Sequence, residues 1–143
     1  MRSKRGFTLI EVLVVLVILM GLAGIVTVNV VRHQSEARLK TARIQIRQLQ
    51  LAVQLYQSEQ GRIPTQQQGL DALVHPPTIA PVPARYPAEG YMESHRLPKD
   101  PWGAEFIYLE PGREGQPFEI LSAGSDGELG GTGDAQDLST ADQ

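Results

Sequence analysis

The chain has 143 residues with a formal net charge of −3, and 41% of its residues are hydrophobic. This length allows one small domain with a modest core outside any membrane segment. The chain contains no cysteine, which excludes disulfide bonds and thiol catalysis. The sequence has no phosphate-binding loop and no evident pairing of a nucleophile with a base, so we expect a structural subunit and not an enzyme.

An apolar run begins close to the N-terminus. Residues 7–31 are apolar apart from four polar positions, and three basic residues precede them: Arg2, Lys4 and Arg5. As a helix this run would reach about 37 Å, and the hydrocarbon core of a bilayer is about 30 Å thick. The run therefore predicts a transmembrane helix, and the bases favour a cytoplasmic N-terminus. A carboxylate inside it costs about 2.5–3.5 kcal/mol, so Glu11 requires a partner charge.

The order Gly6-Phe7-Thr8-Leu9-Ile10-Glu11 resembles a type III signal, the leader of type IV pilins and of the pseudopilins of type II secretion systems. In those families a prepilin peptidase cuts after the glycine and methylates the new first residue. The resemblance implies cleavage between Gly6 and Phe7. It also makes Glu11 the fifth mature residue, whose carboxylate would meet the cationic amine of Phe7 on a neighbouring copy and offset its desolvation.

An ordinary secretory signal peptide and a plain single-pass anchor are the alternatives for this start. The apolar region of a signal peptide is about 7–15 residues long and ends in small residues at a cleavage site. The long run after Glu11 does not offer such a site. The glycine, phenylalanine and glutamate order therefore favours the pilin-type leader.

The helical pattern continues beyond the apolar run. A single apolar stripe recurs at spacings of three and four: Leu39, Ala42, Ile46, Leu49, Val53 and Tyr56. No proline interrupts residues 7–60, so we expect one long helix that ends near Gln60 with Gly61 as a left-handed cap. The stripe is typical of a core face or of a coiled coil, and its short length favours the core. The bases on the other faces favour a solvated surface over a nucleic-acid site, because no aromatic residues interleave with them.

The segment after the long helix contains turn and loop signals. Thr65 and Gln68 have the spacing of a capping box, which predicts a short helix that buries three residues: Leu70, Leu73 and Val74. Seven prolines then occur within residues 76–101, a composition that excludes helix interiors and central strands. We expect a long loop that side chains attach to the long helix, namely Tyr86, Tyr91 and Leu97.

Two apolar segments predict a β-hairpin. Residues 104–109 and 117–121 flank the polar residues 111–116. Trp102 is expected to fill the core at the start of this sheet. The predicted fold class is therefore α+β, with a long N-terminal helix packed by a short helix and a small antiparallel sheet.

An acidic, glycine-rich segment follows the hairpin. Half of residues 124–133 are glycine, so the backbone can turn tightly and bring carboxylates together with exposed carbonyl groups. A hard cation such as calcium takes six to eight oxygen ligands of this kind. A flexible acidic tail explains the same composition, and the residues alone leave both alternatives open.

Several segments carry a narrower resemblance: residues 62–65, 68–73, 97–103, 122–127 and 131–133. With the leader and the long helix, they resemble the general secretion pathway protein G family, the major pseudopilins of type II secretion, over nearly all of residues 1–138. That resemblance implies a structural calcium site with side-chain ligands at Asp126, Asp134 and Asp137, and with carbonyl ligands near Ala123. The chain departs from the family at Val28, where a proline is common.

The same resemblance implies a subunit that polymerises with itself into a periplasmic pseudopilus and helps drive exoproteins through an outer-membrane secretin. Its other expected partners are minor pseudopilins, the prepilin peptidase, and an inner-membrane assembly platform with its ATPase. The expected organisation is a leader (1–6), a transmembrane part (7–31), a periplasmic domain (32–138) and a flexible tail (139–143). A type IV pilin of a surface fibre, or a membrane-tethered calcium-binding domain, is the alternative.

Overall fold

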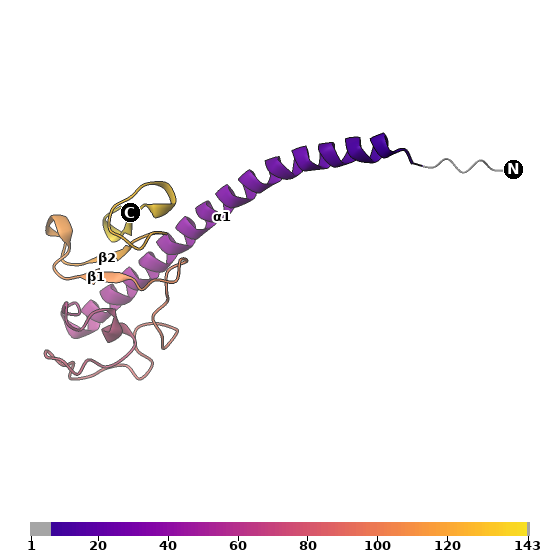
Figure 1. The fold of residues 1–143 in the computed structure, drawn as a ribbon. Helices are drawn as coiled ribbons and strands as arrows, with labels where there is room; N and C mark the ends of the chain where they lie inside the picture. The colour runs from indigo at the N-terminus through magenta and orange to yellow at the C-terminus, as the bar shows by residue number, and fades with distance from the viewer. Residues whose placement is uncertain (1–6, 143) are drawn as a thin grey trace. The chain divides into compact units, whose positions relative to one another are not determined.

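The computed structural model describes residues 7–142, and for residues 22–32 and 134 it describes the backbone only. Helix α1 (Leu9–Gln60) is its largest element (Figure 1). The remaining elements follow in chain order: η1 (Leu70–Leu73), β1 (Ile107–Leu109), η2 (Arg113–Gly115), β2 (Glu119–Ser122), η3 (Gly133–Ala135), β3 (Leu138–Ser139) and η4 (Thr140–Asp142). The η elements are short 3₁₀ helices. This arrangement is the α+β fold class that the sequence predicts.

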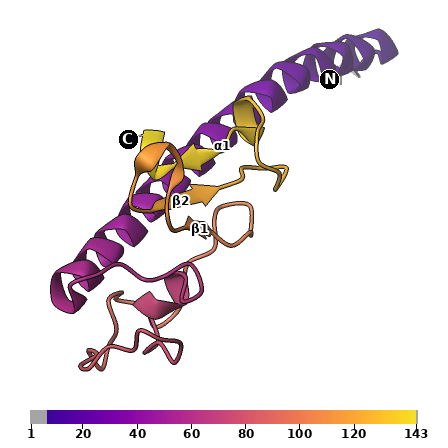
Figure 2. The same cartoon turned by 90° about the vertical axis from the view of Figure 1, so that its left-hand side faces the viewer.

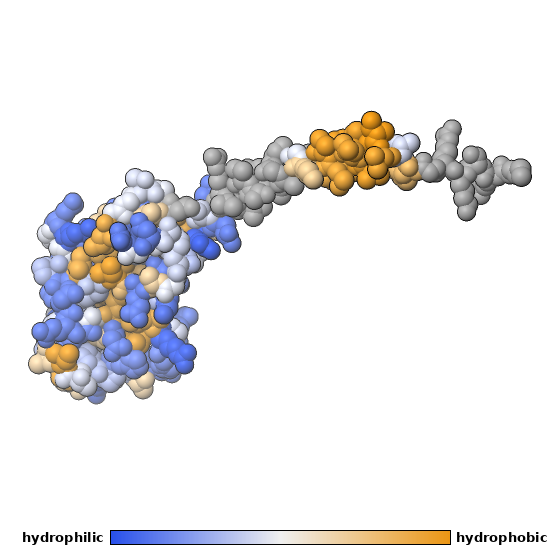
Figure 3. Space-filling model, in the orientation of Figure 1, coloured by the Kyte–Doolittle hydropathy of each residue, from blue (hydrophilic) through white to orange (hydrophobic). Residues whose placement is uncertain are grey.

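The chain forms two compact units that divide between Ala37 and Arg38. In the first unit, the side chains of residues 9–20 are exposed and, apart from Glu11, form an apolar band (Figure 3). Among the residues whose side chains are described, no helical stretch is both long enough and apolar enough to cross a membrane. The leader at residues 1–6 and part of the predicted span, residues 22–31, lie outside those residues.

The second unit is built on the C-terminal half of α1. The predicted apolar stripe is confirmed as its core face, because five of its members are fully buried: Ala42, Ile46, Leu49, Val53 and Tyr56. The predicted end of the helix is also confirmed. Gly61 has a φ of 70°, and its N–H donates to the carbonyl oxygen of Gln57 at 2.8 Å, as in a left-handed cap.

The predicted capping box is present in the turn that follows α1. The N–H of Thr65 donates to Gln68 Oε1 at 3.1 Å, and the N–H of Gln68 donates to Thr65 Oγ1 at 3.3 Å. The helix after it is a single 3₁₀ turn, η1, which buries three apolar residues as expected: Leu70, Leu73 and Val74. The amide of Gln68 is buried and also donates from Nε2 to the carbonyl oxygens of Ile79 and Pro81, at 2.8 and 3.0 Å. One side chain therefore joins this turn to the proline-rich loop.

Replacing Gln68 with alanine should lower the free energy of unfolding by about 2 kcal/mol, because it removes the hydrogen bonds that the buried Gln68 amide makes to the backbone of Thr65, Ile79 and Pro81. Urea unfolding followed by circular dichroism measures this change. Gln67→Ala is the matched control, since Gln67 is exposed next to it and should change the stability by less than about 0.5 kcal/mol. Equal effects of the two substitutions would contradict the role assigned to Gln68.

The proline-rich loop contains no helix or strand between η1 and β1 in the described chain, as predicted. Tyr91 is buried and packs against Tyr56 of α1 with ring centroids 5.1 Å apart, and Tyr86 contacts Tyr91 edge-on at 5.4 Å. Burial raises the pKa of Tyr86 to about 12, so its hydroxyl stays protonated and donates to the carbonyl oxygen of Ala72 at 3.1 Å. Leu97 is partly buried against the same core. The predicted attachment of this loop is confirmed.

The sheet has three antiparallel strands in the order β1-β2-β3 and lies beside the C-terminal half of α1 (Figures 1 and 2). Tyr108 pairs with Ile120, which confirms the predicted hairpin, and Trp102 packs partly buried against the core. The strands are shorter than predicted, because Glu105 pairs with Lys99 in an isolated bridge before β1 begins. The third strand was not predicted, since two residues are too few to show an alternating pattern.

The predicted flexible tail at residues 139–143 requires correction for residues 139–142. Ser139 pairs with Leu121 in the sheet, and both Ser139 and Thr140 are buried. The hydroxyl of Thr140 accepts a hydrogen bond from the N–H of Ile120 at 3.2 Å. These contacts supply hydrogen-bond partners to the edge of β2 that does not face β1. Without them the N–H group of Ile120 would have no partner.

Candidate functional site

The start of α1 carries the residues that the leader motif singles out. Thr8 precedes the helix, and its Oγ1 accepts a hydrogen bond from the N–H of Glu11 at 3.3 Å, so Thr8 is the N-terminal cap. Glu11 lies in the first turn, where a carboxylate interacts favourably with the helix dipole. Both Phe7 and Glu11 are exposed and accessible to another molecule. Gly6 lies outside the described residues.

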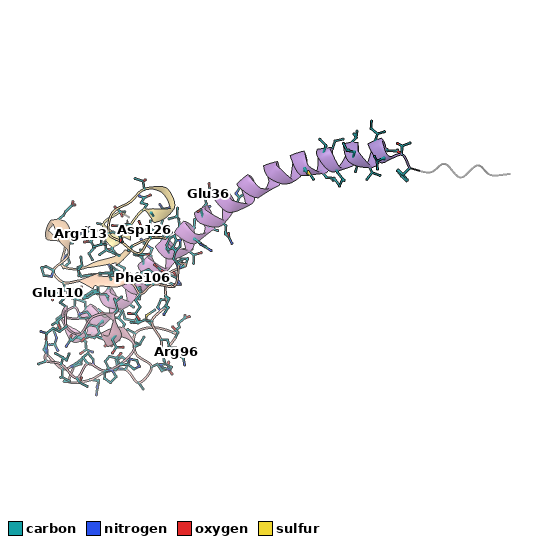
Figure 4. The ribbon with its side chains drawn as sticks, in the orientation of Figure 1. Glu36, Arg96, Phe106, Glu110, Arg113 and Asp126 are labelled. Atoms are coloured by element: carbon teal, nitrogen blue, oxygen red, sulfur yellow. The ribbon has the colours of Figure 1, made fainter. Side chains whose placement is uncertain are left out.

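The acidic loop joins β2 to β3, and Figure 4 shows Asp126 within it. Asp126 Oδ1 accepts a hydrogen bond from the N–H of Glu128 at 3.2 Å, which closes a tight turn. Asp137 Oδ2 accepts one from the N–H of Gly130 at 2.9 Å and so links the middle of the loop to its C-terminal end. The loop is therefore folded on itself.

Two glycines of this loop approach the backbone opposite them. Gly124 has a φ of 66°, and a Cβ atom there would lie 2.9 Å from the carbonyl oxygen of Gln136. Gly131 has a φ of 125°, and a Cβ atom there would collide with the carbonyl oxygen of Ala135. Only glycine combines these dihedral angles with such close contacts. The carbonyl oxygens of Ala135 and Gln136 therefore face the glycines of this loop.

One carboxylate oxygen in this loop lacks a partner. Asp137 Oδ1 is buried and makes no hydrogen bond among the described residues. Leaving such an acceptor unpaired costs about 1–3 kcal/mol, and a bound cation would remove this cost. Carboxylate and carbonyl oxygens are also the ligands that calcium prefers. The residues present therefore fit a calcium ion.

The structure places the predicted calcium ligands on one loop, but it does not show all three together. Asp134 belongs to η3, and its side chain lies outside the described residues. Within the described part of the chain, no three histidine, cysteine, aspartate or glutamate side chains form a metal-binding group. The predicted ligand set of Asp126, Asp134 and Asp137 thus remains a prediction.

A second carboxylate cluster beside the loop was not predicted. Glu119 of β2 is buried, and Arg113, in the turn before this strand (Figure 4), donates to it from Nε and NH2 at 2.9 and 2.7 Å. The Ser139 hydroxyl of β3 donates to Glu119 Oε1 at 2.5 Å. Hydrogen bonds from Arg113 hold the pKa of Glu119 at about 2, against the opposite effect of burial. In the sequence, only a single acidic residue inside an apolar strand, with an arginine six residues before it, indicates this ion pair.

Asp100 forms another buried cluster next to the sheet. Its Oδ1 accepts hydrogen bonds from the N–H groups of Trp102 and Ala104 at 3.1 and 2.8 Å. Its Oδ2 accepts one from the Ser122 hydroxyl at 2.6 Å, and both side chains are buried. Ser122 is the last residue of β2, so this contact holds the turn at Asp100 against the start of the acidic loop.

Comparison with known protein families gives two matches. Residues 29–141 match the family described as type II secretion system (T2SS), protein G. Residues 1–27 match the family described as prokaryotic N-terminal methylation motif. The first match covers the second unit up to residue 141, including the acidic loop, and the second covers the predicted leader.

The chain is also similar to individual members of this family. Type II secretion system core protein G of Aeromonas hydrophila is 45% identical over 129 residues, which cover 90% of this chain and 88% of that protein. The protein of the same name from Pseudomonas aeruginosa is 40% identical over 141 residues, covering 99% of this chain and 97% of the relative. The crystal structure of the major pseudopilin from the type 2 secretion system of enterohaemorrhagic Escherichia coli superposes with a TM-score of 0.67 at 33% identity, covering 80% of this chain and 96% of the other. These matches show that the chain belongs to the protein G family of the type II secretion system, the family of the major pseudopilins.

Proposed function

We propose that the chain is a major pseudopilin, a subunit that polymerises into the periplasmic pseudopilus of a type II secretion system. In this role it helps drive exoproteins through the outer-membrane secretin. The observation that carries the proposal is the match of residues 29–141 to the protein G family of the type II secretion system, preceded by a match of residues 1–27 to the N-terminal methylation motif. The exposed apolar side chains of residues 9–20 are consistent with a helix that packs against lipid and against neighbouring copies.

The proposal assigns separate roles to the residues at the start of the chain. A prepilin peptidase cleaves between Gly6 and Phe7, and the amine of Phe7 becomes methylated. The carboxylate of Glu11 then meets the cationic amine of Phe7 on the preceding copy, so that each charge offsets the desolvation of the other in the apolar surroundings. The protein is anchored in the inner membrane by one span, with the second unit in the periplasm.

Replacing Glu11 with alanine should abolish pseudopilus assembly. A hydrogen bond to a charged group contributes about 1.5–3 kcal/mol, so each subunit contact should weaken tenfold or more. The full-length variant is produced with the other secretion components. Sheared filaments are collected by centrifugation and imaged by electron microscopy, and the exoprotein released into the medium is measured.

Glu36→Gln is the matched control for this experiment, because Glu36 is another exposed acid of α1 and should not affect assembly. Mass spectrometry of both variants checks that the leader is still removed, which separates a defect in processing from a defect in assembly. Normal filaments and normal secretion by the Glu11→Ala variant would contradict the proposal and favour a membrane-tethered domain that acts alone.

We further propose that the acidic loop holds a calcium ion through Asp126, Asp134 and Asp137, with carbonyl oxygens near Ala123 contributing. The buried, unpaired Oδ1 of Asp137 and the carbonyl groups that face Gly124 and Gly131 support this assignment. When bound, calcium supplies positive charge that offsets the repulsion among the carboxylates. The carboxylates then hold the loop against the sheet, so that each copy presents a fixed surface to its neighbours.

The remaining partners in this proposal are those of an assembly subunit. Minor pseudopilins share the filament, and an inner-membrane platform with a cytoplasmic ATPase supplies the motion. The chain supplies no energy itself, because its sequence contains no phosphate-binding loop. No nucleic acid takes part.

A further inference from the structure

A second stripe runs along α1 on the side that faces away from the core. Its members recur at spacings of three and four: Lys40, Ile44, Arg47, Leu51 and Leu55. This spacing places them on one face of the helix. The apolar members are largely exposed, with Ile44 at 61%, Leu51 at 55% and Leu55 at 49%. We call this apolar and basic surface the outer strip of α1.

A groove lies beside the end of the outer strip. Its volume is about 390 Å³, and its walls include Leu51, Leu55, Ala52 and Met92. Glu93 stands on the rim formed by the loop. Arg47 does not line the groove itself but lies one helical turn before Leu51, which does. A partner segment that places an aliphatic side chain in the groove can place a neighbouring acidic side chain next to Arg47.

The acidic loop presents side chains of this kind. Leu129 is 61% exposed, although it is a large apolar residue in a polar segment. Its neighbour Glu128 is exposed as well, and so is Asp126. An exposed leucine beside an exposed acid complements the outer strip in both polarity and charge.

These two surfaces cannot meet within one copy of the chain. The sheet packs on the core face of α1, since Ile120 of β2 and Leu138 of β3 share one core with Ile46. The acidic loop connects β2 to β3 and therefore lies on the sheet side of the helix, as Figures 1 and 2 show. The outer strip faces the opposite way. A contact between two different surfaces of identical copies repeats from head to tail, and it produces a filament when the rotation between copies does not close a ring.

We propose that the outer strip of α1 binds the acidic loop of a second copy of this chain, with Leu129 in the groove beside Leu51 and Leu55 and with Glu128 next to Arg47. The opposite orientation would place Glu128 beside Glu93, where the two carboxylates repel each other. This inference rests on the proposed function and identifies the surfaces through which the second units of neighbouring subunits meet in the pseudopilus.

Cysteine cross-linking tests the contact directly. The chain contains no cysteine, so introduced thiols are the only ones available. Leu129→Cys is combined in turn with Ile44→Cys, Leu51→Cys and Leu55→Cys in the full-length protein within assembling cells. We expect at least one pair to give a ladder of dimers, trimers and longer chains after oxidation, whereas each single variant gives dimers at most. Leu129→Cys with Ile79→Cys is the control, since Ile79 is exposed in the proline-rich loop outside both surfaces.

A charge exchange tests the orientation. Arg47→Glu and Glu128→Arg should each lower the yield of filaments by up to about fivefold, the upper limit for an exposed ion pair. The double variant should restore most of the yield. The combination of Arg38→Glu with Glu128→Arg should not restore it, because the exposed Arg38 lies nine residues before Arg47 and so on the opposite face of α1.

The outcomes separate this inference from the proposed function. If the wild-type chain forms filaments but none of the three cysteine pairs gives a ladder, the inference is wrong and the proposed function stands. Cross-linking of the helix cysteines to another protein instead of a second copy would also overturn it. If the wild-type chain forms no filaments with all secretion components present, the proposed function fails and this inference fails with it.

Discussion

Replacing Glu119 with glutamine is expected to lower the free energy of unfolding by about 2 to 3 kcal/mol. The folded-state pKa of Glu119 is about 2, compared with an ordinary value of 4.5, because Arg113 donates two side-chain hydrogen bonds to the buried carboxylate. One pKa unit corresponds to about 1.4 kcal/mol, and the half-exposed side chain of Arg113 reduces the total. The substitution also replaces one carboxylate oxygen with an NH2 group, which cannot accept the hydrogen bonds that Arg113 donates from its backbone N–H and from Nε to Oε2.

The pH dependence of stability gives an independent check on Glu119. Because its pKa is lower in the folded state, its contribution is complete above pH 4.5 and disappears as the pH falls toward 2. The wild-type protein should therefore lose stability across this range more steeply than the Glu119→Gln variant. Urea unfolding of both proteins at a series of pH values measures the difference.

Glu105→Gln is the matched control for Glu119, since Glu105 is an exposed acid on the neighbouring strand segment. Its loss should change stability by less than about 0.5 kcal/mol at pH 7. If the profiles of the wild-type and Glu119→Gln proteins run parallel between pH 4.5 and 2, then the ion pair with Arg113 does not stabilise the fold as described here.

Calcium is expected to raise the thermal unfolding midpoint of the full-length protein in detergent by 10 °C or more. A ligand at a hundred times its dissociation constant adds about 2.7 kcal/mol to stability. For a domain of about 100 residues, each kcal/mol moves the midpoint by about 4–8 °C. The physical reason is the acidic loop, where carboxylates repel one another and Asp137 Oδ1 is buried without a partner. A chelator should reverse the rise.

Two variants make the calcium experiment specific to the proposed ligands. Asp126→Asn removes a proposed ligand charge and should lose most of the calcium response. Glu128→Gln removes an exposed acid of the same loop that is not a proposed ligand, and it should keep the response. Equal responses of the two variants, or an equal rise with magnesium, would argue against a built calcium site. The outer strip of α1 predicts in addition that Glu128→Gln lowers filament yield without changing the calcium response.

The sequence alone determined the features that depend on neighbouring residues. The spacing of Ala42, Ile46 and Leu49 predicts the core face of α1 because a helix repeats its faces every 3.6 residues. Short segments of sequence likewise predict the capping box of Thr65 and Gln68 and the hairpin of β1 and β2. The leader and the family resemblance also follow from the order of residues, as the family matches confirm.

Only the tertiary structure decided which distant residues meet. Glu119 gains its partner Ser139 across twenty residues, and β3 and the burial of Thr140 depend on that return of the chain to β2. A pairing between residues so far apart leaves no periodic pattern in the local sequence. The sequence therefore predicted a flexible tail for residues 139–143. The outer strip of α1 is present in the sequence as an ordinary exposed face. It becomes a candidate interface only because the sheet occupies the opposite side of the helix and leaves Ile44, Leu51 and Leu55 uncovered.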